Sequence, residues 1–162
     1  MKKYRKFILL AFVLLFTIAL ITFFYYYSIY SKDHENIERI INKAYQEVET
    51  LAEIDDIDYF TGDKEYYFIF GRNNIDIPML IWLNDEEIHK IYLVEWVDKE
   101  EIKQKTAVRY PDISIKRINA GIMDKELIYE VLYEDEEERL GYLYFKLKNG
   151  DFIKRYRLGK VL

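Results

Sequence analysis

The sequence predicts an α+β fold with one N-terminal transmembrane helix followed by two small units, each a helix packed on an antiparallel sheet. An uncharged apolar segment near the N-terminus predicts the transmembrane helix. Two helix-like segments begin at Asp33 and Asp98, 65 residues apart, and four strand-like segments follow each of them. We expect residues 1–31 to form the cytoplasmic N-terminus and anchor, residues 32–97 the first unit and residues 98–162 the second.

The composition favours packed domains and excludes several kinds of site. Of the 162 residues, 51% are hydrophobic and 17% are aromatic, so a core can form and disorder is not expected. The absence of cysteine excludes disulfides, thiolate zinc sites, cysteine nucleophiles and a lipid-modified N-terminal cysteine. A unit of roughly 65 residues has a marginal core. Because no Pro/Gly/Ser-rich linker separates the two units, we expect them to be fused rigidly.

The apolar segment is long enough to cross a bilayer. Phe7 to Ser31 is a run of 25 positions without a charged side chain. Its centre, Phe7–Phe24, would be about 27 Å of helix at ~1.5 Å per residue. A hydrocarbon core is about 30 Å thick, so the segment spans it once Tyr25–Tyr27 are included. A cleaved signal peptide is the alternative, but FFYYYSIYS lacks small residues one and three positions before a cut.

The residues on either side of this segment predict its orientation. Four cations precede it and a mixed set of charges follows, which by the positive-inside rule places the N-terminus in the cytoplasm and the C-terminal domains outside the cell membrane. The four cations are Lys2, Lys3, Arg5 and Lys6. Tyr25, Tyr26, Tyr27 and Tyr30 would then form an aromatic belt at the outer interface.

The part of the chain after the anchor is acidic. From Lys32 onward it carries 20 Lys and Arg against 29 Asp and Glu, a net charge of −9. Nucleic-acid binding needs a basic footprint, so no nucleic-acid partner is expected, nor is peripheral adhesion to anionic lipid. The excess of carboxylates is typical of a solvated surface that aids solubility.

The first unit has the pattern of one helix and four strands. Apolar residues at steps of three and four from Ile37 to Leu51 predict a helix, which Ser31 or Asp33 would cap. Gly62–Lys64 and Asn84–Glu87 are expected to be hairpin turns. The predicted strands are 56–62, 65–72, 78–84 and 88–96.

The second unit repeats this order. Asp98 and Glu101 have the spacing of a capping box, and Pro111 should end the helix. Asn149-Gly150 predicts a two-residue hairpin turn. The predicted strands are 113–121, 126–134, 140–148 and 151–158.

These features together resemble a known family. The relevant part of the sequence is the stretch VETLAEIDDIDYFTGDKEYYFIFGR, followed by MLIWLND. Its most characteristic residues are Phe60–Gly62, the Tyr66-Tyr67 pair and Trp82. With these features the chain resembles the TseB-like family of membrane-anchored regulators of cell-wall elongation in Gram-positive bacteria. The resemblance implies two PepSY-like (cystatin-like) modules. It further implies a non-enzymatic role beside the cell-wall synthesis machinery, through a membrane-anchored penicillin-binding protein, and it supplies no active-site residues.

Few residues suggest catalysis or metal binding. His34 is expected in the first helical turn outside the membrane and His89 on a strand face, where either would act at most as a pH sensor. Neither has the second histidine or cysteine typical of a metal site, and Ser114 lacks a Ser–His–Asp grouping. We therefore expect no catalytic, cofactor-binding or metal-binding residues, no cofactor and no small-molecule substrate.

Two acidic groups need separate consideration. Asp135–Glu138 has no calcium-loop pattern and is expected to be an acidic, solvated turn. A glycosidase needs two carboxyl groups about 5–10 Å apart. There are enough carboxylates for such a pair in Asp55, Asp56 and Asp58, but nothing in the sequence places two of them in a cleft.

Two continuous apolar runs lack the alternation of a sheet covered on one face. They are Tyr66–Phe70 and Met79–Leu83. Either their second face packs on the neighbouring unit, or it presents aromatic anchors such as Trp82 to a protein partner.

Three functional hypotheses follow from the sequence. The first is a single-pass, extracytoplasmic binding module that regulates peptidoglycan elongation through protein contacts. The second is a PepSY-type inhibitor or chaperone of an extracellular protease. The third is a carboxylate-based enzyme acting on wall polymers. The partner, the contact surface and the oligomeric state are not predicted.

Overall fold

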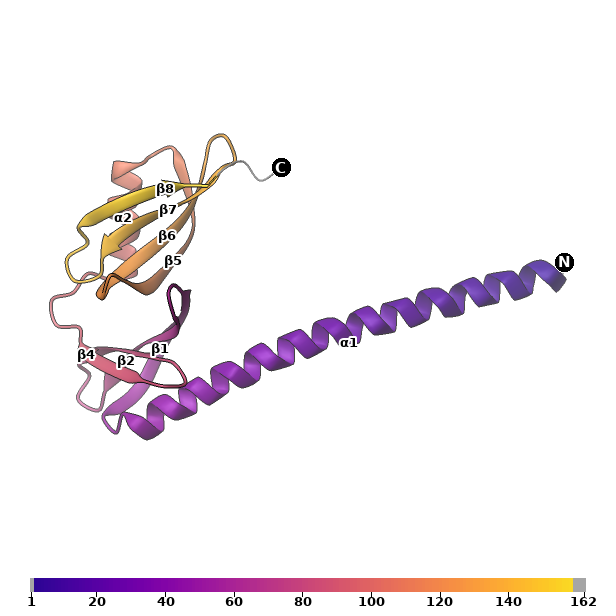
Figure 1. The fold of residues 1–162 in the computed structure, drawn as a ribbon, viewed down its shortest axis with the longest axis horizontal. Helices are drawn as coiled ribbons and strands as arrows, with labels where there is room; N and C mark the ends of the chain where they lie inside the picture. Colours follow the sequence, from indigo (N-terminus) through magenta and orange to yellow (C-terminus); the bar gives the residue numbers. More distant parts are fainter. Residues whose placement is uncertain (1, 159–162) are drawn as a thin grey trace. The chain divides into compact units, whose positions relative to one another are not determined.

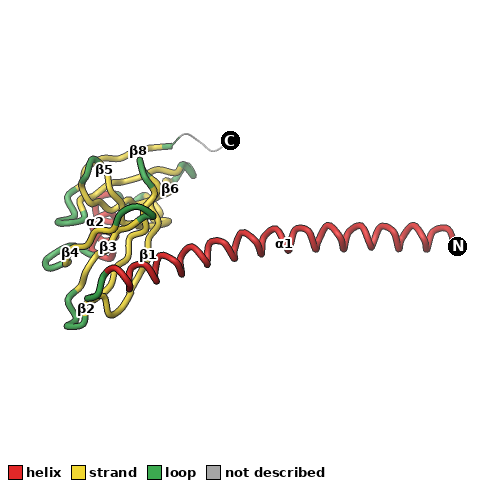
Figure 2. Tube along the Cα trace, turned by 60° about the horizontal axis from the view of Figure 1, so that its bottom comes forward, coloured by secondary structure: helices red, strands yellow, loops and turns green. Residues whose placement is uncertain are grey.

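The computed structural model describes residues 2–158, with side chains described for residue 10, residues 12–32 and residues 34–158. Within this range the chain forms two helices and eight strands (Figures 1 and 2). The chain divides into two compact units, of which the first ends at Lys43 and the second begins at Ala44. The predicted α+β class, with one long N-terminal apolar helix and two four-stranded antiparallel sheets, is confirmed.

The first helix, α1, is longer than the sequence analysis predicted. It runs unbroken over Lys2–Glu47, so no second helix begins after Ser31 and the predicted cap there is wrong. The Ser31 hydroxyl lies 3.3 Å from the Glu35 carboxylate, and the Asp33 side chain lies outside the described residues. The physical reason is that the SKDHEN stretch has no proline or glycine to end a helix where the composition changes from apolar to polar.

The first sheet contains four antiparallel strands in sequence order. They are β1 (Leu51–Thr61), β2 (Glu65–Asn73), β3 (Pro78–Leu83) and β4 (Ile88–Tyr92). All four predicted strands are present, but two of their bounds differ by several residues. β4 ends at Tyr92 instead of residue 96, and β1 begins at Leu51, which the sequence analysis assigned to the helix. The register of β1 against β2 shifts between Leu51 and Glu53 and again between Ile54 and Asp56. Such bulges destroy the period-two pattern that would have revealed the start of the strand.

The second sheet also has its strands in sequence order, after a short helix. The elements are α2 (Lys99–Arg109), β5 (Ile113–Met123), β6 (Glu126–Asp135), β7 (Leu140–Lys146) and β8 (Phe152–Arg157). The predicted N-cap is confirmed, because the Asp98 carboxylate accepts a 2.8 Å hydrogen bond from the Glu101 amide. The helix ends at Arg109, ahead of Pro111 as expected.

The turn between β7 and β8 is longer than the predicted two residues. The Lys146 amide donates to the Asp151 carbonyl, and the Gly150 amide donates to the Lys146 carbonyl, which closes a loop over residues 147–150. Leu147 is fully buried and its amide bonds to the Leu127 carbonyl, so the strand ends early to bury this side chain. Gly150 has a φ of 69°, which suits glycine because it has no Cβ.

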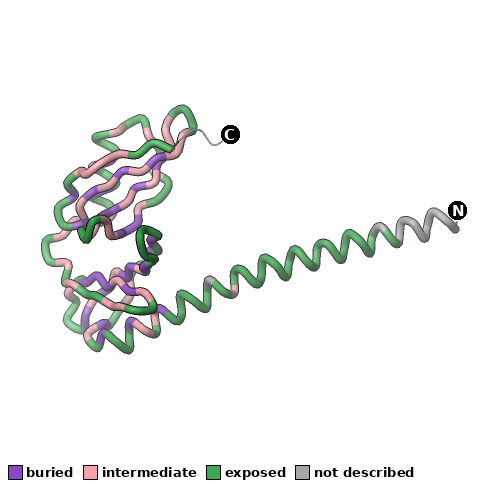
Figure 3. Tube along the Cα trace, viewed as in Figure 1, coloured by how far each residue is buried: buried purple, intermediate pink, exposed green. Residues whose placement is uncertain are grey.

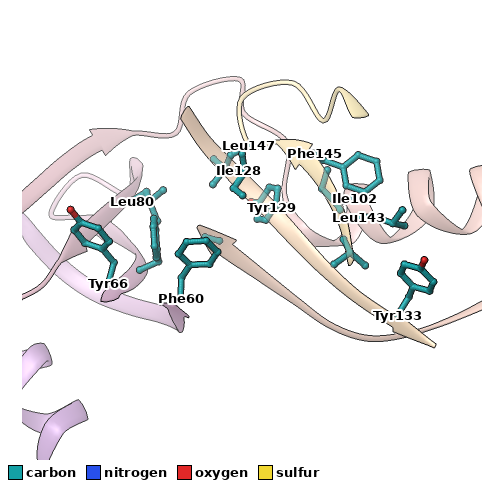
Figure 4. Packing of buried hydrophobic residues seen from close by; sticks show 13 residues of the cluster. Phe60, Tyr66, Leu80, Ile102, Ile128, Tyr129, Tyr133, Leu143, Phe145 and Leu147 are labelled. Atoms are coloured by element: carbon teal, nitrogen blue, oxygen red, sulfur yellow. The ribbon is translucent and has the colours of Figure 1, made fainter. Parts of the chain in front are cut away.

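One hydrophobic cluster includes residues of both sheets and of α2 (Figure 4). Figure 3 shows the buried segments along the chain. The first sheet contributes Phe60, Tyr66, Phe68 and Leu80, the second contributes Tyr129, Val131, Tyr133, Leu143 and Phe145, and α2 contributes Ile102. Ile69, Ile81 and Leu83, on the opposite face of the first sheet, are also fully buried. Burial of both faces is therefore the reason that the two apolar runs do not alternate.

The two sheets meet along their edge strands β1 and β5. The Phe60 ring lies against Gly121 so closely that a Cβ on this glycine would be 2.5 Å from two ring carbons. The Asn119 amide group donates to the Tyr59 carbonyl at 3.1 Å, and the Ala120 amide donates to the buried Asp58 carboxylate at 2.7 Å. Side-chain contacts thus join the edges, because the two strands belong to separate hydrogen-bonded sheets.

Candidate functional site

Five side chains converge at one end of the first sheet, and we call them the Glu87 cluster. They are Lys64, Tyr66, Trp82, Glu87 and His89. Two hairpins bring them together, because Thr61 pairs with Glu65 and Leu83 with Ile88 at the same end of the sheet. Tyr66, Trp82 and His89 lie on one face of it, since Phe68 pairs with Trp82 and Trp82 with His89.

The Glu87 carboxylate is the centre of the cluster. One of its oxygens accepts hydrogen bonds from the Tyr66 hydroxyl and, at 3.2 Å, from the Lys64 ammonium group. Its other oxygen lies 3.2 Å from Nε2 of His89. The His89 ring stacks on the Trp82 indole, with 5.1 Å between ring centroids and 20° between planes. The carboxylate therefore links both hairpins to the indole.

These contacts keep Glu87 ionised. The hydrogen bond from Tyr66, followed by those from His89 and Lys64, lowers the pKa of Glu87 to about 2. The same bond to Glu87, together with burial, raises the pKa of the Tyr66 hydroxyl. At neutral pH Glu87 is therefore a carboxylate and Tyr66 a neutral phenol. Their hydrogen bond fixes the two side chains, and neither group exchanges protons near neutral pH.

The cluster is open to solvent. The side chains of Lys64 and His89 are 54% and 46% exposed, and Trp82 is half-buried, whereas Tyr66 is buried beneath them. A tryptophan held rigidly beside polar groups at a surface is typical of a protein-contact anchor.

The structure brings together three residues that the sequence analysis named for different reasons. Tyr66 and Trp82 came from the aromatic runs and His89 from the search for titratable groups. Tyr67 faces the other way and packs on Tyr59, with ring centroids 5.0 Å apart. The analysis did not identify Glu87 or Lys64, because both lie in expected turns and only the pairing of the hairpins shows that they meet.

The three aspartates of β1, Asp55, Asp56 and Asp58, have cations as partners. The Lys99 ammonium group lies 2.6 Å from both Asp56 and Asp58, and Arg72 lies 3.3 Å from Asp55. Burial raises the pKa of Asp58, while Lys99 and the Ala120 amide act in the opposite direction. These contacts place Asp58 at the junction of the two sheets, where it bonds to both α2 and β5.

The remaining candidate residues lie in a turn, on α1 and on β5. Asp135, in the turn that contains Asp135–Glu138, accepts from the amides of Glu137 and Arg139 and pairs with the Arg139 guanidinium at 2.8 Å. His34 lies on α1, 3.3 Å from Glu38, and Ser114 is exposed on β5. Over residues 2–158, no three His, Asp or Glu side chains are grouped so as to hold a metal ion.

The apolar part of α1 meets the requirements of a membrane span by length and composition. Within the described residues one helix does so, over Phe12–Glu47, and the side chains of its most apolar window are not buried by the rest of the chain. Tyr25, Tyr26, Tyr27 and Tyr30 are each more than 60% exposed on this helix. The helix could therefore anchor the chain in a membrane.

A curated relative and a solved structure are similar to this chain. The probable cell wall elongation regulator TseB of Bacillus subtilis (strain 168) is 23% identical over 147 residues, which cover 88% of this chain and 89% of the relative. This similarity confirms the resemblance to the TseB-like family. The YpmB protein from Bacillus subtilis has a similar fold, with a TM-score of 0.61, 19% identity and coverage of 75% of this chain and 96% of that chain. A scan against protein-family models found no match.

Proposed function

We propose that the protein is a single-pass, membrane-anchored binding module that regulates peptidoglycan elongation through protein contacts and without catalysis. The observation that carries the proposal is the similarity to a cell wall elongation regulator over 88% of the chain. The long apolar helix and the surface-exposed Glu87 cluster support it, because they supply a means of anchoring and a rigid contact site.

The proposal includes a definite arrangement in the cell. Residues 1–31 form the cytoplasmic N-terminus and the anchor, and residues 32–97 and 98–162 form two PepSY-like (cystatin-like) units outside the membrane. The order of one helix and four strands, which occurs twice, supports this division. The partner we propose is a membrane protein of the penicillin-binding class, bound by the Glu87 cluster.

Site-specific crosslinking in living cells tests the proposed contact. A photoreactive amino acid at Trp82 of the full chain should crosslink to a penicillin-binding protein, which mass spectrometry of the crosslinked band would identify. The matched control carries the same amino acid at Val108, which is 86% exposed on α2, and should give no such band. Equal crosslinking from both positions, or no cell-wall protein from Trp82, would contradict the proposed surface.

Protein chemistry on the mature polypeptide tests the anchor. We expect the protein in the membrane fraction with its original N-terminus. A form released into the medium, with a new N-terminus beyond Ser31, would refute the tethered module.

A further inference from the structure

A pocket of about 240 Å³ lies between the C-terminal end of α2 and the second sheet, and we call it the arginine pocket. Arg109, Arg139, Arg155 and Arg157 all line it. Four arginines around one pocket are unexpected in a region whose net charge from Lys32 onward is −9. Its acidic lining residues are Asp112, Asp135, Glu136 and Glu137.

Two of these carboxylates are already used by one arginine. The Arg139 guanidinium lies 2.8 Å from Asp135 and 2.8 Å from Glu137, so this arginine is neutralised within its own turn. Asp112 and Glu136 remain and are both exposed. The four arginines and four carboxylates make the lining neutral as a whole. Because Asp135 and Glu137 both pair with Arg139, the other three guanidinium groups face only two carboxylates, Asp112 and Glu136.

Aromatic rings hold Arg109 and Arg155 in place. The Cζ atom of Arg155 lies 4.8 Å from the Tyr110 ring and 4.7 Å from the Tyr133 ring, and its Nε donates to the Tyr133 hydroxyl at 2.6 Å. The Cζ atom of Arg109 lies 4.2 Å from the Phe152 ring. Stacking fixes a guanidinium plane while leaving its terminal N–H groups as donors. Within the described part of the chain, neither side chain forms an ion pair with a carboxylate.

Arg157 adds a third guanidinium on the same face of the sheet. Arg155 pairs with Leu143 and Arg157 with Gly141 in adjacent antiparallel strands, and residues two apart on a strand project to one side. Arg157 is exposed, and none of the carboxylates whose side chains the structure describes forms an ion pair with it. The pocket therefore has two oriented guanidinium groups and a third at its rim.

We propose that the arginine pocket binds a phosphate group, as a phosphate ester or a diphosphate. Guanidinium forks match the oxygens of phosphate in bidentate geometry, and several of them together favour an anion with more than one charge over a single carboxylate. The inference is independent of the proposed protein contact, because the pocket lies on the second sheet and the Glu87 cluster lies on the first.

Calorimetric titration of the full chain in dodecyl maltoside micelles, which contain no phosphate, tests the proposal with pyrophosphate as the probe. We expect binding at one site, weakened about tenfold by Arg157→Gln, since one charge-assisted hydrogen-bonding group is lost. Arg155→Lys keeps the charge but loses the fork and should also weaken binding. Arg157 is exposed, so its replacement leaves the core intact, and a thermal melt verifies this.

Arg117→Gln is the matched control, because it removes the same charge from β5 outside the pocket and should leave pyrophosphate binding unchanged. No binding to the wild-type chain, or equal weakening by Arg117→Gln and Arg157→Gln, would overturn the proposal. Two further titrations separate the sources of phosphate. Binding of a soluble glycerol-phosphate oligomer indicates a polymer ligand, and binding of micelles that contain phosphatidylglycerol indicates a lipid headgroup.

Discussion

At the scale of single residues, Glu87 shows how a turn carboxylate can organise a surface. It lies in an expected turn, yet it contacts Tyr66, Lys64 and His89 from two hairpins. No local pattern indicates the contacts with Tyr66 and Lys64, because these residues are 21 and 23 positions away from Glu87 in the sequence. Local sequence rules could predict the turn itself, but pairing of the strands decides which side chains meet there.

Replacement of Glu87 by glutamine should remove part of the dependence of stability on pH. The pKa of Glu87 falls from an ordinary value of 4.5 to about 2, so its bonds stabilise the folded state above pH 4.5 and are lost as the pH falls toward 2. Chemical denaturation from pH 7 to pH 2 should show a smaller decrease in the free energy of unfolding for Glu87→Gln than for the wild type.

Glu86→Gln is the control for this series. Glu86 is the neighbouring residue, its side chain is 80% exposed, and its contact with Lys64 is long, at 3.6 Å. An exposed pair of this kind contributes little, so the replacement should leave the acid-induced loss of stability as it is in the wild type. Parallel curves for Glu87→Gln and the wild type would show that the Glu87 contacts contribute nothing to the pH dependence.

Lys99→Met should destabilise the junction between the sheets. The change leaves the buried Asp58 without its cation, and we expect the free energy of unfolding to fall by about 2–3 kcal/mol at pH 7. Loss of Lys99 raises the pKa of Asp58 further above its ordinary value of 3.8. The deficit should therefore shrink as the pH falls through the folded-state pKa of Asp58.

Urea unfolding at several pH values measures this deficit. Lys103→Met removes an exposed lysine from the next turn of α2, where it pairs with the exposed Glu100, and should have little effect. A deficit in Lys99→Met that is small or unchanged with pH would mean that the Ala120 amide alone satisfies Asp58.

At the scale of elements, α2 is the part that its sequence predicted most completely. The cap at Asp98 and the end before Pro111 are local signals, and both are confirmed. The burial of Thr106 is different, because its hydroxyl lies fully buried and has no hydrogen-bond partner among the described residues. A polar atom at such a position becomes evident only once the helix is packed.

Thr106→Val should stabilise the protein. Valine has nearly the same shape and removes the unsatisfied hydroxyl, so we expect the free energy of unfolding to rise by about 1 kcal/mol. Thr106→Ala removes the hydroxyl as well but leaves a cavity, and it should be less stable than Thr106→Val. Thermal unfolding of the wild type, Thr106→Val and Thr106→Ala tests this order of stability. A melting temperature for Thr106→Val below that of the wild type would show that the Thr106 hydroxyl is hydrogen-bonded in the folded protein.

At the scale of the whole molecule, the contact between Phe60 and Gly121 joins the two sheets of the compact unit. Gly121→Ala would place a methyl group 2.5 Å from the Phe60 ring and should lower the free energy of unfolding by about 1–3 kcal/mol. In a Phe60→Leu background the same change should cost less, because the smaller side chain leaves room. A double-mutant cycle by urea unfolding measures this coupling.

Gly150→Ala provides the control cycle. It strains a residue with a φ of 69° that touches Lys105 and Ile102 instead of Phe60, so its cost should be the same with and without Phe60→Leu. If the Gly121→Ala cost were also the same in both backgrounds, the two sheets would not be coupled through this contact.

The sequence by itself determined most elements of this protein: the apolar helical segment, though not its unbroken continuation to Glu47, eight strands in two groups of four, the Asp98 cap and most of the turns. These follow from periodicity, breakers and caps, which act over a few neighbouring residues. Tertiary structure alone decided that β1 begins at Leu51, that both faces of the first sheet are buried, and that the Glu87 cluster and the arginine pocket form. Each of these depends on strand pairing or packing between residues far apart in the chain, and such long-range contacts leave no periodic trace in the sequence.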